Sequence, residues 1–493
     1  MPTAETWAIL AASTAACVVV VELFFRLPFI ASVESVNRAS LRALDTVRSP
    51  RVSDHWKEKV LPRYAARILL ASLKLGGLLL LCGAVFVAVY FAVGWLWMRD
   101  LVMVSETLGR AWVQLGMLVI GVAWAIVRAR LGQRGRAGRP VEEHSPSSMM
   151  LHRLALGSQS MREFAFAIDG RRARAAIENV KVERPVYVTG LARAGTTIVL
   201  EALYASGRFA SFTYRDMPFI MAPYTWGGLT GRGRGKGERR ERAHGDRIQV
   251  GLDSPEAFEE VFWTTFAGRD TTGGGGLQPV AGSNPDVIER YRAYIRRFLA
   301  RARRHRNAPS LRYLAKDNNH ILRLDWLREA FPDAIIVTPF RDPVSHAASL
   351  LRQHQRFLAR HASDPFGLEY MDWLGHFEFG AHHRPFLVGG HRPARRSEEL
   401  LEPRYWLEYW ASVYGDLLER HGDAVAWLDY GKLCREPASM LASLASLVGL
   451  ETEALAPWAD QVSAPAPVER PEFEAVVSDR VRAVYAALQA RSI

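Results

Sequence analysis

The sequence predicts a three-layer α/β domain with a mostly parallel sheet, preceded by an α-helical transmembrane module. Three observations predict it: a strand–loop–helix pattern at 186–205, a second buried strand at 334–340, and long apolar runs before residue 130. Strands that alternate with helices form parallel sheets with helices on both faces. We expect a membrane module of about three helices at 1–130, a linker with amphipathic helices at 131–184, and the α/β domain at 185–493.

The strand–loop–helix pattern has the features of a phosphate cradle. Gly190, Gly195 and Thr197 follow the spacing G-x-x-x-x-G-x-T between an apolar strand and a helix. Glycines allow backbone N–H groups to approach anionic oxygens, and a helix N-terminus completes such a P-loop-like site. A Walker A motif has Lys before its last Ser/Thr, whereas this chain has Thr196, and Arg193 is the one cation of the loop. The pattern favours a phosphate-containing donor other than ATP with magnesium.

The apolar runs predict three membrane spans, at 7–25, 75–98 and 111–127. Nine Lys and Arg residues lie between positions 26 and 67, and five between 128 and 139. The positive-inside rule then places the N-terminus outside, with the basic loop and everything after about residue 128 inside. We therefore expect a multi-pass protein of the cell inner membrane with a cytoplasmic catalytic domain. The three cysteines show no disulfide or zinc spacing, which agrees with a reducing compartment.

The net charge of +12 indicates anionic partners: phosphate esters, acidic lipid or nucleic acid. Two Gly-rich stretches, 227–247 and 273–276, are expected to be mobile loops, the first lying against acidic lipid or an anionic substrate rather than nucleic acid. The remaining patterns predict helices at 149–180, 197–205, 255–264 and 286–304, and strands at 186–189 and 209–214.

A second group of polar residues follows the strand Ala334–Phe340. Arg341 comes directly after this strand, Asp342-Pro343 begins a helix, and Ser349 lies eight residues beyond Arg341. Ligands of open parallel sheets bind outside the carboxyl ends of the strands. Arg341 is therefore placed to contact an anion, and a helical Ser folded back beside it can donate a hydroxyl. Taken alone, this group is better explained by local pairing of Arg341 with Asp342 and by a solvent-facing Ser349.

The two patterns together resemble the sulfotransferase family that uses 3′-phosphoadenosine 5′-phosphosulfate (PAPS). Its first motif, P-[KR]-[ST]-G-[TS]-[TS], corresponds to residues 192–197, and its R-[DN]-P motif with a following Ser to Arg341–Pro343 and Ser349. Residues 427–433 are similar to the family's Y-E-D-L strand end. The chain departs from the pattern at Ala192, Ala194 and Gly431. The resemblance covers roughly residues 150–490.

The resemblance implies roles for individual residues. The cradle would hold the 5′-phosphosulfate, Arg341 and Ser349 the 3′-phosphate, and Tyr430 the adenine, without a metal. The cradle residues in question are Arg193, Ala194, Gly195, Thr196 and Thr197.

Two residues are candidates for the catalytic base. Asp216 is the first choice because its predicted strand would lie beside the cradle strand; His320 is the second. Lys316 is a candidate to neutralise the bridging oxygen of the donor, and the acidic stretch 253–260 could contact the acceptor.

The sequence thus predicts a membrane-anchored, PAPS-dependent sulfotransferase. Its acceptor would be a hydroxyl on a lipid, glycolipid or lipid-linked glycan, since anchoring places the site at the bilayer surface; no nucleic acid is expected. Two alternatives remain: a membrane-associated P-loop NTPase or kinase, and a non-enzymatic membrane scaffold with basic loops. The first would need a cradle lysine and a Walker B acid, and the second leaves three ordered motifs unexplained.

Overall fold

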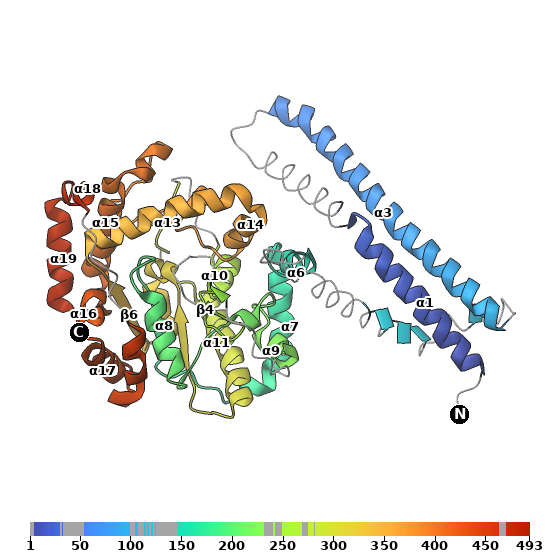
Figure 1. Ribbon diagram of the computed structural model, residues 1–493, viewed down its shortest axis with the longest axis horizontal. Helices are drawn as coiled ribbons and strands as arrows, with labels where there is room; N and C mark the ends of the chain where they lie inside the picture. The colour runs from blue at the N-terminus through green and yellow to red at the C-terminus, as the bar shows by residue number, and fades with distance from the viewer. Residues whose placement is uncertain are drawn as a thin grey trace. The chain divides into compact units, whose positions relative to one another are not determined.

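The computed structural model describes two compact units, residues 1–150 and 151–493, which we treat separately (Figure 1). The described residues are 4–29, 32, 54–98, 104–106, seven positions between 113 and 124, 146–230, 240–241, 249–268, 275–280, 282–462 and 470–493.

The first unit is built on two helices, α1 (Ala4–Arg26) and α3 (Asp54–Met98). They pack through small residues of α1, Ala12 and Ala16, against Tyr90 of α3. Among the described residues, one helix, covering His55–Leu96, is long and apolar enough to cross a membrane, and the apolar part of α1 is shorter. The third expected span, 111–127, lies mostly outside the described residues. The three-span topology therefore stays a prediction.

The second unit contains a five-stranded parallel sheet, which confirms the α/β prediction. Its strand order is β2-β5-β1-β6-β7, and every pairing in it is parallel. The strands are β1 (Val186–Val188), β2 (Phe209–Ala210), β5 (Arg312–Lys316), β6 (Ile335–Phe340) and β7 (Ala426–Asp429). A separate antiparallel pair joins β3 (Arg240–Glu241) to β4 (Gln249–Val250). Because the five strands are parallel, their carboxyl ends meet at one edge of the sheet.

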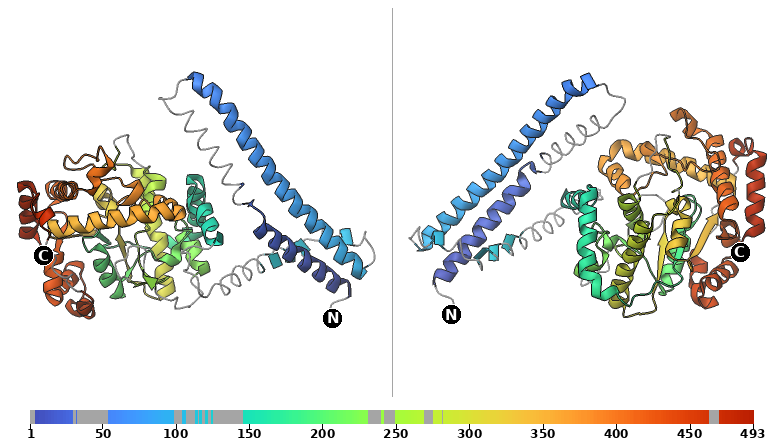
Figure 2. Two further views of the ribbon diagram at one scale, coloured as in Figure 1. Left: turned by 45° about the horizontal axis from the view of Figure 1, so that its top comes forward. Right: turned by 180° about the vertical axis from the view of Figure 1, so that it is seen from behind.

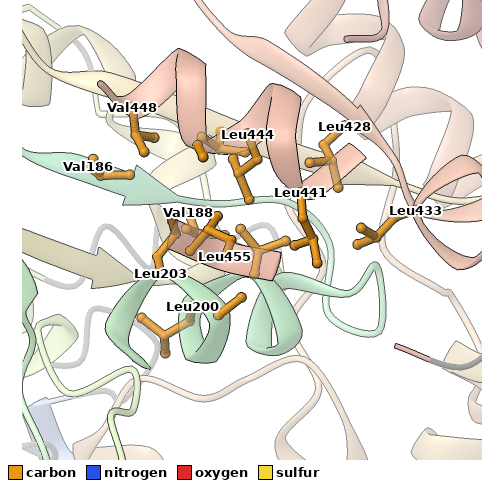
Figure 3. Close-up of a cluster of buried hydrophobic side chains, with 14 of the residues drawn as sticks. Val186, Val188, Leu200, Leu203, Leu428, Leu433, Leu441, Leu444, Val448 and Leu455 are labelled. Carbon is orange, nitrogen blue, oxygen red and sulfur yellow. The ribbon is translucent and has the colours of Figure 1, made fainter. Parts of the chain in front are cut away.

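Alternating side chains of β1 face the two helical layers. Val186 and Val188 enter an apolar cluster with α8 (Thr196–Ala205) and α17 (Pro437–Val448) (Figure 3). Tyr187 points to the opposite face, where its hydroxyl lies 2.9 Å from that of Tyr291 on α11 (Pro285–Arg306). The sheet therefore lies between two helical layers.

The remaining helices surround this sandwich. α13 (Pro343–Ser363) crosses the unit as a long continuous helix and packs against α15 (Figure 2). The others are α6 (Pro146–Leu156), α7 (Gln159–Ile177), α9 (Pro223–Thr230), α10 (Glu260–Phe266), α12 (Leu324–Ala330), α14 (Pro365–Trp373), α15 (Pro403–His421), α16 (Tyr430–Arg435), α18 (Pro471–Glu474) and α19 (Asp479–Arg491), with 3₁₀ segments η1 (Tyr214–Asp216), η2 (Asn318–Leu322), η3 (Gly380–His382), η4 (Ser397–Leu401) and η5 (Thr452–Gln461).

Three sequence predictions about local structure were wrong in part. The strand expected at 209–214 ends at Ala210, because Thr213 caps η1 through a reciprocal hydrogen-bonded box with Asp216. The helix expected at 255–264 begins only at Glu260. In the stretch 227–247, α9 continues through Thr230. Most of that stretch, and part of 273–276, lies outside the described residues.

Candidate active site

The cradle loop connects β1 to α8 and is shaped by two residues with positive φ angles. Gly195, at φ 102°, forms the N-cap of α8, and a Cβ there would come within 2.4 Å of the Tyr430 ring. Arg193 has φ 70°, a conformation that non-glycine residues rarely adopt. The Ala194 N–H donates to the Leu191 carbonyl (3.3 Å), so this amide serves the loop rather than an anion. The N-terminus of α8 completes the cradle.

A buried histidine on α13 holds the loop in place. His346 Nε2 lies 2.8 Å from the Ala192 carbonyl, and its Nδ1 accepts a hydrogen bond from Trp410 Nε1 (3.1 Å). The carbonyl can only accept and the indole can only donate, so the proton of the neutral ring must be on Nε2. Burial lowers the pKa of His346 to about 3, against the smaller opposing effect of the hydrogen bond to Ala192. The ring therefore stays neutral.

The anion-binding residues expected from the sequence meet at the carboxyl edge of the sheet. Arg341 follows β6, and its guanidinium lies 5.7 Å from the centre of the Tyr430 ring, which follows β7. Arg193 donates through Nε to Ser349 Oγ (3.3 Å), which joins the cradle to α13. Asp342 caps α13, accepting from the Ser345 N–H at 2.8 Å. Three separate strand ends thus form one site.

Sequence reasoning missed two further arginines: Arg352, whose charge interacts with that of Arg341, and Arg470, whose charge interacts with that of Arg352. Arg352 lies one turn beyond Ser349 on α13, and Arg470 precedes α18. Burial first, and then the positive charges of Arg470 and Arg341, lower the pKa of Arg352; Arg356 and Arg193 act in the same direction. Cations held near one another repel, so the cluster is suited to a multiply charged anion. The helical spacing from Ser349 could have revealed Arg352, whereas nothing in the sequence marks Arg470.

Lys316 ends β5 at the same edge, in register with Val188 of β1. Its Nζ lies 3.7 Å from Glu256 Oε1, and both side chains are buried, 8% and 9% exposed. The Tyr214 hydroxyl lies 3.4 Å from the other carboxylate oxygen of Glu256. A lysine and a carboxylate therefore lie beside the cradle strand. A lysine can stabilise the charge on a leaving oxygen, and a carboxylate can accept a proton. Glu256 lies in the acidic stretch that the sequence marked as a possible acceptor contact.

Asp216 does not lie where its assignment as the base required. β5 separates β2 from β1, so the segment after β2 is not beside the cradle strand. Asp216 is 1% exposed; one carboxylate oxygen pairs with Arg301 at 2.7 Å, and the other accepts from the Thr213 N–H and hydroxyl at 2.8 and 3.0 Å. The expectation of neighbouring strands was wrong, and the contacts of Asp216 are those of a structural carboxylate.

His320, the second choice, is fully buried in η2 rather than exposed at the sheet edge. Its ring packs edge-on against Tyr187, with centroids 5.4 Å apart, and its Nε2 lies 3.5 Å from Glu259 Oε1. Burial, aided by the charge of Arg323, lowers its pKa well below the usual value. His320 thus belongs to the polar core beneath the sheet, on the face of α11.

A second carboxylate, Glu378, is hydrogen-bonded to Asn318, two residues after Lys316. Glu378 Oε1 accepts from Asn318 Nδ2 at 2.8 Å. Burial would raise the pKa of Glu378, but the charge of His376 and the hydrogen bonds from His376 and Asn318 outweigh it and lower the pKa to about 2. Such a carboxylate is a poor proton acceptor near neutral pH. Within the described ranges, no three His, Cys, Asp or Glu residues are grouped so that they could hold a metal ion.

The fold and the site define a P-loop-like α/β unit with a lysine-free loop between β1 and α8 and a group of arginines on and around α13. Residues 185–386 match the model of the sulfotransferase family, and this match supports a sulfotransferase enzyme. The match begins at the residue before β1 and includes the cradle, Lys316, Arg341 and Ser349. It leaves Tyr430 and Arg470 outside.

Three solved structures are similar to this chain. Sulfotransferase STF1 from Mycobacterium tuberculosis H37Rv is 14% identical, with a TM-score of 0.35, over 67% of this chain and 83% of that one. STF9 from Mycobacterium avium is 15% identical, with a TM-score of 0.39, over 71% and 86%. A sulfotransferase from Alicyclobacillus acidocaldarius is 14% identical, with a TM-score of 0.30, over 63% and 96%. No curated protein matches the chain.

Proposed function

We propose that this sulfotransferase takes its sulfuryl group from PAPS and transfers it to a hydroxyl acceptor. The observation that carries the proposal is the hydrogen bond between Arg193 and Ser349, because it joins the cradle to the Arg341 region. PAPS carries anionic groups at both ends of its nucleotide, and a site with two linked cationic regions fits such a donor. The missing Cβ at Gly195 leaves room for the ring of Tyr430, the residue that would contact the adenine of the donor.

In the proposed reaction, Glu256 accepts the proton of the acceptor hydroxyl. The hydroxyl oxygen forms a bond to sulfur while the bond between sulfur and the bridging oxygen of the donor breaks. Lys316 stabilises the negative charge that develops on this oxygen, and the cradle amides and Arg193 orient the phosphosulfate. The products are a sulfate ester and adenosine 3′,5′-bisphosphate, with the proton on Glu256. Glu256 takes the place of Asp216 in this proposal because it lies beside Lys316, whereas Asp216 is paired with Arg301.

Calorimetric titration of the full chain with adenosine 3′,5′-bisphosphate and with ADP tests the donor. The bisphosphate should bind at least tenfold more tightly, since the Arg341 region would contact its 3′-phosphate. Equal affinities would reject PAPS as the donor and favour a nucleotide without that phosphate.

For the location we propose a multi-pass protein of the inner membrane with its catalytic unit in the cytoplasm. Support comes from the apolar helix His55–Leu96 and from the basic residues on either side of the predicted spans. A catalytic unit held at the bilayer would favour an acceptor hydroxyl on a lipid, glycolipid or lipid-linked glycan.

A further inference from the structure

One irregular stretch of the second unit, residues 375–390, lies between α14 and α15 and contains η3. We call it the 375–390 segment. It packs against α13 at the face that carries His354, Phe357 and His361. Gly380 has φ 81°, and a Cβ there would come within 2.5 Å of His361 Nδ1 and 3.0 Å of Phe357 Cβ. The backbone of the segment therefore lies directly on α13.

Two imidazoles of α13 hold the segment by accepting hydrogen bonds. The Gly380 N–H donates to His354 Nδ1, and the Ala381 N–H donates to His361 Nδ1, both at 3.2 Å. A backbone N–H can only donate, so each Nδ1 must accept, and the proton of each neutral ring is on Nε2. A protonated imidazole carries hydrogen on both nitrogens and cannot accept. Protonation of either ring and its bond to the segment therefore exclude each other.

A third histidine shows the contrast. His383 Nδ1 donates to the Glu378 carbonyl at 2.7 Å, and its Nε2 lies 3.1 Å from the Tyr405 hydroxyl. Because a hydroxyl can donate or accept, His383 can keep both hydrogen bonds when it is protonated. His354 Nε2 and His361 Nε2 have no hydrogen-bond partner among the described residues. Protonation of these two rings must therefore act on the bonds of their Nδ1 atoms.

The surroundings of His354 keep it neutral near pH 7. Burial lowers the pKa of His354 to about 4, and the charge of His361 acts in the same direction. The ring also faces His383 of the segment, with centroids 5.4 Å apart, and Trp406 of α15 at 5.5 Å. The bond between His354 and Gly380 is therefore intact near pH 7.

The surroundings of His361 are more highly charged. Burial lowers the pKa of His361 first, and the charges of His382 and Arg360 lower it further, whereas those of Asp372 and Asp364 raise it. His382 Nδ1 lies 2.9 Å from each carboxylate oxygen of Asp372. The net direction is downward, so His361 is also a neutral acceptor near pH 7.

The segment supports η2, which follows Lys316 of β5. Asn318 Nδ2 donates to Glu378 Oε1 at 2.8 Å, and Asn319 Nδ2 donates to the Gly375 carbonyl at 3.0 Å. Two side chains of η2 thus depend on the segment for their hydrogen bonds.

We propose that the 375–390 segment is held by a pH-sensitive latch, in which neutral His354 and His361 bind it to α13 and their protonation in acid releases it together with its support of η2. A histidine released from the latch has a pKa near 6.5, above the value in the closed form. The latch is therefore fully closed above about pH 6.5 and weakens as the pH falls toward 4. Its effect on the region of Lys316 rests on the proposed function, whereas the latch itself does not.

Hydrogen–deuterium exchange of the full chain in nanodiscs tests the latch without any substrate. The rates at pH 7, 6 and 5 are converted to protection factors with the intrinsic exchange rates. Protection of the peptide that contains Gly380 and Ala381 should fall about 20-fold between pH 7 and pH 5 from His354 alone, and further as His361 binds its proton. Peptides from β1 and β6 should keep their protection, because the opening is local.

Asparagine variants separate hydrogen-bond acceptance from titration. The asparagine Oδ1 takes the position of Nδ1 and can accept the same N–H, but it does not titrate. The double variant His354→Asn with His361→Asn should therefore keep its protection from pH 7 to pH 5, and each single variant should remove part of the fall. His354→Leu, which cannot accept, should lower the protection already at pH 7. His382→Asn, in the same segment, is the matched control and should keep the wild-type fall.

The inference is overturned if wild-type protection of the segment stays constant from pH 7 to pH 5, or if β1 and β6 lose protection together with it. It is also overturned if the double asparagine variant shows the wild-type fall, or if His382→Asn abolishes that fall. Calorimetry with adenosine 3′,5′-bisphosphate tests the proposed function separately. A wild-type chain that shows the expected exchange but does not bind the bisphosphate would reject the proposed function and leave the latch in place.

Discussion

His346 and Ala192 are joined by a hydrogen bond of 2.8 Å between the imidazole Nε2 and the carbonyl oxygen of the cradle loop. The loop that would hold the phosphosulfate is thus positioned by a side chain from α13, about 150 residues later in the chain. Trp410 fixes the tautomer by donating to the other ring nitrogen. The shape of the cradle therefore depends on a neutral imidazole as well as on its glycines.

We expect His346→Phe to weaken donor binding. Phenylalanine keeps the ring but leaves the Ala192 carbonyl and the Trp410 N–H without partners, which costs about 1–3 kcal/mol for each buried group. The Kd for adenosine 3′,5′-bisphosphate, measured by calorimetry, should rise at least tenfold. His305→Phe, at an exposed position, serves as the control. An unchanged Kd in His346→Phe would show that the loop keeps its shape without this bond.

Acid should destabilise the second unit through its buried histidines. The pKa of His346 is lowered by burial to about 3 in the folded chain, against about 6.5 when unfolded. The unfolded state binds the proton more readily, so the stabilisation is complete above pH 6.5 and falls as the pH drops toward 3. Between pH 8 and pH 5 the loss is about 2 kcal/mol for this group. Thermal melting at the two pH values measures it. His346→Gln should reduce the difference, and His305→Gln should not.

Arg341→Ala should discriminate between two ligands that differ in one phosphate. A charge-assisted contact contributes about 1.5–3 kcal/mol, so the affinity for adenosine 3′,5′-bisphosphate should fall more than tenfold. Affinity for adenosine 5′-phosphosulfate, which lacks the 3′-phosphate, should change little. Equal losses for the two ligands would assign Arg341 to the fold, through its contact with Tyr430.

The two carboxylates considered as the base should respond differently to amide substitution. Glu256→Gln removes proton acceptance beside Lys316, and loss of a general base typically lowers the rate by about 10²–10⁴-fold. Its melting temperature and donor affinity should stay near the wild-type values. Asp216→Asn should instead lower the melting temperature, because it breaks a buried ion pair with Arg301, and keep most of the turnover. The reverse result, an active Glu256→Gln and a stable but inactive Asp216→Asn, would restore Asp216 as the base.

The charge pattern of the first unit predicts where reporters will lie. A reporter fused after residue 130 should be cytoplasmic, and one inserted near Val104 should be external, because few basic residues lie between the second and third predicted spans. Protease protection in spheroplasts reads out both. A cytoplasmic reporter near Val104 would reject the three-span arrangement.

The sequence predicted those parts of the fold that depend on local chemistry. Asp342-Pro343 marks the start of a helix by its cap, and the structure has α13 where these residues place it. It could not predict that β5 lies between β2 and β1, since strand order is set by long-range packing. Because of this error, the sequence analysis placed Asp216 beside the cradle and did not identify Glu256 as a candidate base. Glu256 lies next to Lys316 because the segment that leads into α10 carries it there. Arg470 was missed because it lies outside any motif, and only the fold brings its charge close to Arg352.

The long helix α13 also fixes a distance within the proposed donor site. His346 supports the cradle, and Ser349 bonds Arg193 three residues later, on one continuous helix with a rise of about 1.5 Å per residue. The separation between the two proposed anion subsites is therefore set by a rigid helix rather than by a flexible loop. The site would therefore select a nucleotide mainly by the distance between its charged groups, and less by contacts to its base or sugar.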